Sequence, residues 1–140
     1  MNTRGVIAAG TVMMICGTLA CVPPSTANET ELAPARAVGP VVECDSGCKP
    51  EWERAQVWLA KHSAWKIQIA TDVMIQTYTS VDESAFLDFT IIKEPTGAGR
   101  YRITVSTHCA SWFHCVPGED DTRSTLLYYI KTGTDLWTSL

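Results

Sequence analysis

The sequence has little positive charge. Its 140 residues include 11 lysines and arginines against 15 aspartates and glutamates, which gives a net charge of −4. Proteins that bind nucleic acid concentrate basic residues on one surface, so this balance gives no electrostatic reason to expect a nucleic-acid partner. Long apolar runs are also missing, because the uncharged stretch over residues 5–20 is shorter than the roughly 20 residues that a membrane-spanning helix needs.

The sequence lacks the short motifs that identify common catalytic sites. It contains no Gly-x-Ser-x-Gly nucleophile elbow and no glycine loop for binding phosphate. The acidic run at 119–121 lacks the alternating ligand spacing of a calcium loop. His62 with Asp72 would supply a base and an acid, but no serine stands out as their nucleophile. These absences favour a non-enzymatic protein, and we predict no catalytic residue and no cofactor.

The first 20 residues have the layout of a bacterial export signal. Arg4 supplies a basic start, residues 5–20 are apolar and small, and Pro23 and Pro24 end any helix that continues from them. This pattern predicts that the chain leaves the cytoplasm and that the signal segment is removed.

Two processing sites remain open. Residues 17–21, Gly-Thr-Leu-Ala-Cys, resemble a bacterial lipobox, although Thr18 stands where leucine is usual. The resemblance implies that residues 1–20 are removed and that Cys21 is acylated, which would anchor the protein to a membrane without a spanning helix. The alternative is signal peptidase I cleavage after Ser-Thr-Ala at 25–27, which removes residues 1–27 and leaves a soluble protein.

Both processing routes place the protein in the cell envelope, as a periplasmic protein or as a membrane-anchored lipoprotein. Each removes Arg4 and no acidic residue, so the mature net charge is −4 − 1 = −5. Residues 21–43 contain several prolines and no apolar periodicity, which predicts a flexible tether. Residues 44–140 then form a single small globular domain of ordinary size.

Four of the six cysteines remain after the signal segment is removed or lipidated. They are Cys44, Cys48, Cys109 and Cys115. An even number of cysteines in an oxidising compartment predicts disulfides. Three pairings are possible, and we favour the local ones, partly because Gly47 permits the tight reversal that a short loop needs. Pairing between the two clusters is the alternative, and it would close longer loops.

The domain pattern predicts an α+β fold. An N-terminal helix over 50–62 has proline at its first position, acidic residues in the first turn and basic residues in the last. Strands are predicted where apolar residues alternate or β-branched residues cluster. These segments are 65–69, 73–79, 86–92 and 101–106. We expect the helix to pack on a three- to four-stranded antiparallel sheet.

Two details of this fold stay open in the sequence. Thr71-Asp72 is either a turn or a bend in one long strand, and the continuous apolar phase favours the bend. Residues 122–132 fit a C-terminal helix or a strand, and Gly133 as a stop signal favours the helix. By contrast, Pro95, Gly97 and Gly99 predict a hairpin that joins the strand over 86–92 to the strand over 101–106.

Two His-Cys pairs raise the question of a metal site. His108 and His114 each precede a cysteine, so imidazoles and thiolates are available to zinc or copper. Structural zinc sites space paired cysteines more closely, and oxidised cysteines are not ligands, so a disulfide is the favoured interpretation. The histidines remain weak candidate metal ligands. A cysteine nucleophile would need a free thiol, which the even cysteine count argues against.

Trp112 and Phe113 lie within the predicted small disulfide loop. They either fold back as a lid on the core, which is the commoner arrangement, or they contact a partner. The sequence therefore favours a non-enzymatic binding module that contacts another envelope protein, and an inhibitor role would suit its size. The alternative is a periplasmic metal-binding or hydrolytic protein that uses His108 and His114.

Overall fold

The computed structural model describes residues 25–81 and 83–140. The predicted signal segment and Cys21 lie outside the described residues. The elements in chain order are α1 (Ser25–Arg36), β1 (Val41–Asp45), η1 (Ser46–Cys48), α2 (Lys49–His62), β2 (Ile67–Ala70), β3 (Met74–Thr77), β4 (Asp88–Gly97), β5 (Arg100–His108), α3 (Glu119–Thr132) and η2 (Trp137–Ser139).

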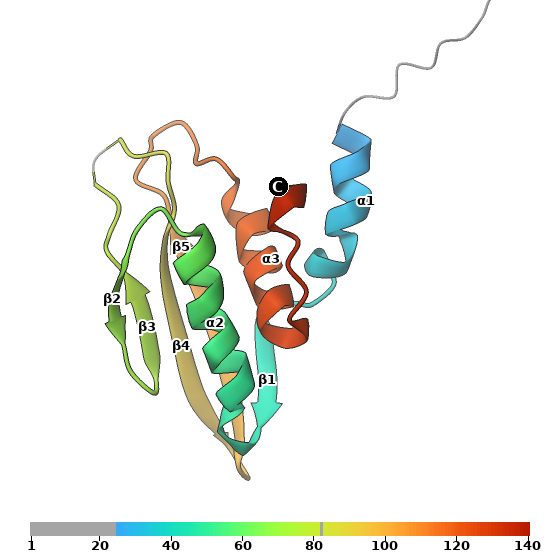
Figure 1. Cartoon of the computed structure of the whole chain (residues 1–140), viewed down its shortest axis with the longest axis vertical. Helices are drawn as coiled ribbons and strands as arrows, with labels where there is room; N and C mark the ends of the chain where they lie inside the picture. The colour runs from blue at the N-terminus through green and yellow to red at the C-terminus, as the bar shows by residue number, and fades with distance from the viewer. Residues whose placement is uncertain (1–24, 82) are drawn as a thin grey trace, which may run out of the picture.

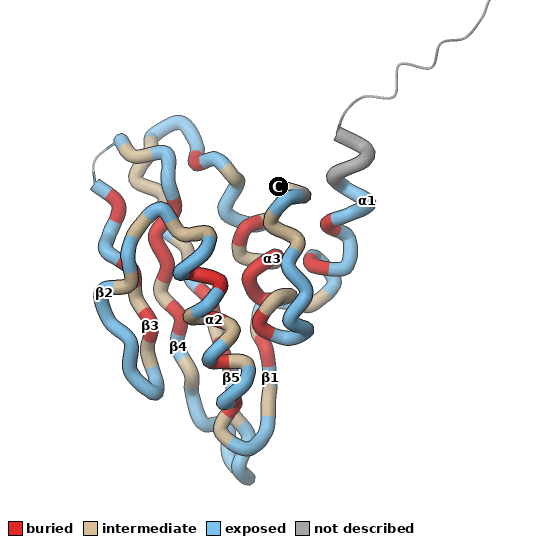
Figure 2. Tube along the Cα trace, viewed as in Figure 1, coloured by how far each residue is buried: buried red, intermediate tan, exposed pale blue. Residues whose placement is uncertain are grey.

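The strands form one antiparallel sheet in the order β1-β5-β4-β3-β2. Helices α2 and α3 lie against the sheet, and α1 packs beside α3 (Figure 1). The buried residues concentrate where the helices meet the sheet, while the outward sides are exposed (Figure 2). The predicted α+β class is confirmed. The predicted strand number is wrong, because the sheet has five strands rather than three or four.

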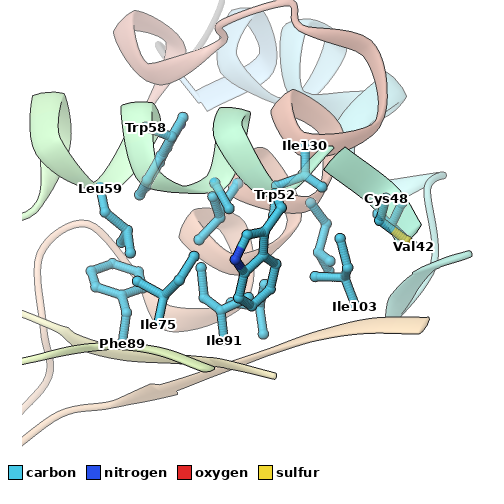
Figure 3. Close-up of a cluster of buried hydrophobic side chains, with 14 of the residues drawn as sticks. Val42, Cys48, Trp52, Trp58, Leu59, Ile75, Phe89, Ile91, Ile103 and Ile130 are labelled. Carbon is cyan, nitrogen blue, oxygen red and sulfur yellow. The ribbon is translucent and has the colours of Figure 1, made fainter. Parts of the chain in front are cut away.

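Helix α2 buries one face along its whole length. Trp52, Ala55, Trp58 and Leu59 follow a spacing of three and four residues and are all buried. Trp58 is fully buried and meets Phe89 edge to face, with 5.8 Å between the ring centroids (Figure 3). Burying one such large side chain contributes about 2–3 kcal/mol. The helix is the second of the chain rather than the first, because α1 precedes it.

Strands β4 and β5 supply the centre of the sheet. Phe89 and Ile91 on β4, and Ile103 and Val105 on β5, alternate with more exposed neighbours and are buried on the helix side. Ile91 stands opposite Val105 in the register, so the two contribute to one apolar layer. Ile91 and Ile103 lie side by side beneath the helices (Figure 3). The predicted hairpin lies at Gly97–Gly99, where both glycines adopt positive φ values.

The segment around Thr71 is a hairpin turn and not a bend in one strand. Strands β2 and β3 pair with each other, and the backbone N–H of Thr71 donates to the carbonyl of Met74 at 2.8 Å. The Thr71 hydroxyl accepts the backbone N–H of Met74 at 3.0 Å. Local hydrogen bonds of this kind stabilise a reversal that the apolar phase does not reveal. The preference for one bent strand is therefore wrong.

The C-terminal element is helix α3, as the stop signal at Gly133 indicates. Gly133 adopts a left-handed conformation (φ 79°), and its backbone N–H donates to the carbonyl of Tyr129. Leu126, Leu127 and Ile130 face the core and are almost fully buried.

Residues 25–43 form defined elements where the sequence predicts a flexible tether. Leu32 and Ala35 on α1 are buried, and α1 packs against α3. The guanidinium of Arg36 donates two hydrogen bonds to the carboxylate of Asp121, at 2.8 and 3.0 Å, and this contact raises the pKa of Arg36 above its ordinary value. The local sequence pattern does not reveal these contacts, because Arg36 and Asp121 are 85 residues apart. For this reason the structure differs from the predicted tether. No helix within residues 25–81 and 83–140 is long and apolar enough to cross a membrane.

Candidate functional site

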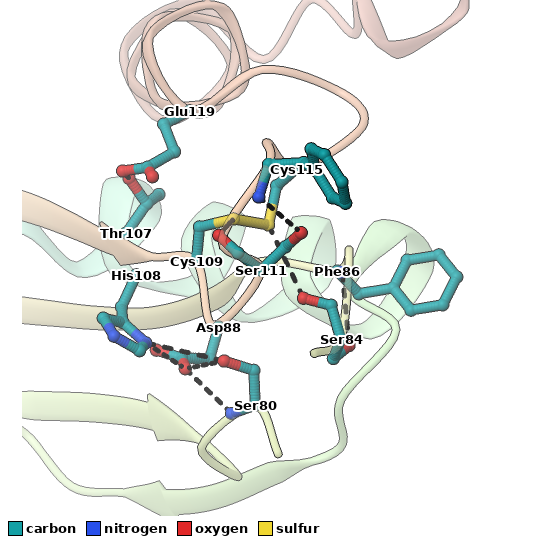
Figure 4. Close-up of a disulfide and its surroundings, with 11 residues drawn as sticks. Ser80, Ser84, Phe86, Asp88, Thr107, His108, Cys109, Ser111, Cys115 and Glu119 are labelled. Atoms are coloured by element: carbon teal, nitrogen blue, oxygen red, sulfur yellow. Dashed lines mark hydrogen bonds and ion pairs between the residues drawn. A yellow bond between two sulfur atoms is a disulfide. The ribbon is translucent and has the colours of Figure 1, made fainter. Parts of the chain in front are cut away.

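The four domain cysteines form two local disulfides. Cys44 bonds to Cys48, and Cys109 bonds to Cys115. The predicted local pairing is thus confirmed, and pairing between the clusters is excluded. The first disulfide joins the end of β1 to the start of α2. The second closes the 109–115 loop (Figure 4). This loop follows directly after β5 and lies at the other end of the sheet from the first disulfide (Figure 1).

The disulfide loop is attached to the neighbouring 78–87 loop. The backbone N–H of Val116 donates to the carbonyl of Ala85 at 3.1 Å. The Sγ atom of Cys115 lies 3.9 Å from the carbonyl oxygen of Ser84, a van der Waals contact because a disulfide sulfur carries no proton (Figure 4). The two loops therefore form one supported end of the molecule.

A buried carboxylate ties the 78–87 loop to the end of β5. Asp88, at the start of β4, accepts the backbone N–H and the hydroxyl of Ser80, each at 2.8 Å. The same oxygen lies 3.1 Å from Nδ1 of His108 on β5 (Figure 4). Ser80 and Asp88 are buried, whereas the His108 side chain is 62% exposed. Sequence analysis does not identify this cluster, since the three residues come from separate segments.

This Ser-His-Asp grouping does not have the geometry of a catalytic triad. In a triad, the aspartate holds one imidazole nitrogen while the other nitrogen contacts the serine hydroxyl. Here the hydroxyl of Ser80 bonds to Asp88 and lies 3.5 Å from Nδ1 of His108, the nitrogen that also faces the carboxylate. The hydroxyl is buried and already engaged, so the cluster positions the 78–87 loop rather than activating a nucleophile.

The described residues do not bring metal ligands together. His108 faces Asp88, and His114 is exposed on the disulfide loop. Within residues 25–81 and 83–140, no group of three or more His, Cys, Asp or Glu side chains is placed to hold a metal ion. Cys109 and Cys115 are bonded to each other, so neither offers a thiolate.

Large apolar side chains are exposed on both loops. Trp112 is 76% exposed and Phe113 is 71% exposed, and their rings pack together with 3.7 Å between centroids. Val81 and Phe86 on the adjacent loop, and Val116 beyond the disulfide, are also more than half exposed. We call these five residues the loop surface. Trp112 and Phe113 do not cover the core, so the lid interpretation is wrong.

An apolar cavity lies below the loop surface, where the end of α2 meets the start of α3. Its volume is about 180 Å³. Phe86 and Val116 lie at its border, and His62 and Trp137 form part of its wall. The imidazole of His62 stacks on the indole of Trp137, with 4.8 Å between centroids and an interplanar angle of 22°. Sequence analysis misses this cavity because its walls come from five separate segments.

His62 is paired with Asp135 and not with Asp72. Its Nε2 atom lies 2.8 Å from Oδ2 of Asp135, and the other carboxylate oxygen accepts the backbone N–H of Trp137 at 3.1 Å. Burial alone would raise the pKa of Asp135, but the hydrogen bond to His62 and the backbone N–H of Trp137 outweigh it and lower that pKa. The pair holds the C-terminal segment against α2.

No protein-family model matches this chain, and neither a curated protein nor a solved structure shows significant similarity to it.

Proposed function

We propose that the chain is an exported, non-enzymatic binding module that contacts another protein of the cell envelope through its loop surface. The observation that carries the proposal is the exposure of Trp112 and Phe113 on a loop closed by a disulfide. Tryptophan and other large aromatic residues dominate the binding energy of protein interfaces when a partner buries them.

The support of the loop favours recognition of a protein partner. Binding costs less free energy when the contacting residues are already held in place. The disulfide closes the loop, the Val116 N–H bonds to the neighbouring loop, and Asp88 anchors that loop through Ser80. Two adjacent aromatic side chains would therefore meet a partner with little further loss of conformational entropy.

A polar hollow beside the aromatics supplies the second half of a typical interface. It has a volume of about 700 Å³ and lies between the disulfide loop and the start of α3. His114, Glu119 and Asp120 are among its lining residues. Interfaces commonly surround an apolar centre with polar groups that remain accessible to water, and this arrangement fits that pattern.

The proposed location follows from the sequence and agrees with the chemistry of the domain. Stable disulfides form in oxidising compartments such as the periplasm. Acylation at Cys21 would keep the module at a membrane surface, whereas cleavage after Ala27 would release it. An inhibitor of an exported enzyme is one form that such a module takes.

The experiment is affinity capture from a solubilised envelope extract, followed by crosslinking of the captured protein to the loop surface. Trp112→Ala with Phe113→Ala should retain at least tenfold less of the captured partner, because truncating an aromatic residue at an interface hot spot costs about 2 kcal/mol or more. The matched control is Val57→Ala with Val73→Ala, which removes exposed apolar groups away from the loops. If wild type captures no protein, or if the aromatic double variant retains the same partner equally well, the proposal is wrong.

A further inference from the structure

We propose that the Cys44–Cys48 disulfide is a thiol–disulfide exchange site, which accepts two electrons from external thiols through attack on the sulfur of Cys44. The inference does not rest on the proposed protein contact, because this disulfide lies at the other end of the sheet from the loop surface (Figure 1). Cys109–Cys115 serves as an internal comparison, since it closes a loop of similar length. Loop closure contributes almost equally to both disulfides, so a difference in their reduction comes from their surroundings.

A half-buried ammonium group without an anionic partner lies beside this disulfide. Nζ of Lys93 donates to the carbonyl of Gly47 at 3.1 Å, and Gly47 is bonded directly to Cys48. The ring centroids of Trp52 and Tyr101 lie 5.0 and 5.9 Å from the same nitrogen. Among the described residues, Lys93 forms no ion pair with a carboxylate. A thiolate on Cys48 would supply the missing negative charge, so the ammonium group stabilises the reduced form.

The charges around the two disulfides differ in sign. Cys48 immediately precedes the first turn of α2, whose free N–H groups favour a negative charge. Cys109 and Cys115 instead line the polar hollow together with the acidic residues 119–121, of which one is bonded to Arg36. A thiolate in that hollow would face negative charge, which disfavours it. Electrostatics therefore favours reduction of the first disulfide over the second.

The backbone between Cys44 and Cys48 acts in the same direction. Ser46 and Cys48 adopt positive φ values of 52° and 55°, which residues other than glycine rarely take. No residue of the 109–115 loop has a positive φ. Opening the first disulfide lets Ser46 and Cys48 relax, whereas opening the second releases no such cost.

Exposure selects Cys44 as the sulfur that is attacked. Cys44 is half-buried, whereas Cys48 is fully buried among the core side chains (Figure 3). An external thiolate bonds to Sγ of Cys44, the bond between the two protein sulfurs breaks, and Cys48 leaves as the thiolate. A second external thiolate then attacks the external sulfur of the mixed disulfide and releases Cys44 as a thiolate. Two electrons pass to the protein, the external thiols become a disulfide, and their protons pass to water or to the released sulfurs.

The test equilibrates the purified mature protein in buffers of reduced and oxidised glutathione, and then alkylates free thiols and maps each pair by peptide mass. Cys44–Cys48 should be half reduced at a ratio of squared reduced glutathione to oxidised glutathione about tenfold or more below that for Cys109–Cys115. The proposal is overturned if both disulfides are half reduced at the same ratio, or if Cys109–Cys115 is reduced first.

Lys93→Gln should narrow this difference about three- to tenfold, because it removes one nearby positive charge. Lys61→Gln is the matched control, since it removes an exposed charge at the far end of α2, and it should leave the difference unchanged. The role of the ammonium group is overturned if Lys93→Gln changes the difference no more than Lys61→Gln. Circular dichroism verifies that both variants are folded.

The site of attack is tested with single cysteine variants whose second disulfide is intact. In Cys48→Ser, the remaining Cys44 should form a mixed disulfide with oxidised glutathione about tenfold or more faster than Cys48 does in Cys44→Ser. Equal rates would overturn the assignment of Cys44. The disulfide-linked dimer of a short unfolded peptide with one cysteine represents protein thiols in a parallel reaction, and the faster of the two reagents identifies the source of the external thiol. Reaction of Cys44 with neither reagent would overturn the proposal.

Discussion

Asp88 holds Ser80 by two hydrogen bonds to a single carboxylate oxygen, one from the backbone N–H and one from the hydroxyl, each 2.8 Å long. Asp88 begins β4, and Ser80 lies in the loop that precedes it. The bond pair therefore fixes where the chain turns into the central strand. Because the same oxygen faces His108, the carboxylate also connects this loop to the end of β5.

Replacing Asp88 by alanine should destabilise the domain by about 2 kcal/mol, because the buried N–H of Ser80 would lose its acceptor. Urea denaturation followed by tryptophan fluorescence measures this change. Asp120→Ala is the control, since the Asp120 side chain is 88% exposed and exposed ion pairs contribute little. Equal stability of the two variants would show that Asp88 does not anchor the loop.

Removal of either disulfide should cost about 2 kcal/mol of unfolding free energy, since both close short loops. The two removals should differ in their effect on binding. Cys109→Ala with Cys115→Ala should increase hydrogen exchange in the 109–115 loop and weaken partner capture. Cys44→Ala with Cys48→Ala alters the opposite end of the sheet and should leave capture unchanged. Loss of capture in both variants would indicate general unfolding instead of a local effect.

The pairing of His62 with Asp135 should make stability fall in acid. The folded pKa of Asp135 is lowered from an ordinary value of 3.8, so its contribution is fully present above that pH. The contribution is lost as the pH falls from about 3.8 through the lowered folded value, because the unfolded chain takes up the proton first. Asp135→Asn should flatten the pH dependence of stability in this range, as measured by denaturation at pH 2.5 to 6. Glu53→Gln, at an exposed position of α2, should leave the dependence as in wild type.

The intact mass of the protein from its native envelope should match a chain that begins at Cys21 and carries acyl groups. A mass that begins at Asn28 would instead indicate a soluble form, and that cut would fall within the first turn of α1.

Alkylation before reduction should modify none of the four domain cysteines, because both pairs are disulfides. Free Cys109 and Cys115, or stoichiometric metal that is lost in the His108→Ala, His114→Ala double variant, would favour the metal-binding alternative.

Local patterns predicted the elements that depend on neighbouring residues. The α2 helix is predicted from Pro50 and from the spacing of Trp52, Ala55 and Leu59, because apolar residues three and four positions apart fall on one face of a helix. The hairpin between β4 and β5 follows from Gly97 and Gly99, whose backbone conformations few other residues adopt. The pairs Cys44–Cys48 and Cys109–Cys115 are also predicted from local sequence, because only a short loop separates the two cysteines of each pair.

Contacts between distant segments were not predictable in this way. Residues 41–43, the first part of β1, are predicted to belong to the tether, because their composition gives no sign that β5 offers them a free edge. The turn at Thr71 is a local feature that the pattern also misses, because its hydrogen bonds to Met74 leave the alternation of apolar residues unbroken. The candidate site was found only in part: the exposed Trp112 and Phe113 lie on the predicted loop, but nothing in their sequence distinguishes an exposed pair from a lid.

The amino-acid sequence by itself determined the class of fold, the main helices, the central hairpin and the cysteines available for pairing. These features depend on periodicity, backbone preference and short loop closure, all of which act within about a dozen residues. Only the tertiary structure decided the fifth strand, the docking of α1 on α3, the anchoring of Ser80 by Asp88 and the cavity beside His62. Each of these joins residues that are distant along the chain, and their burial and hydrogen bonds exist only after the sheet and the helices have packed together.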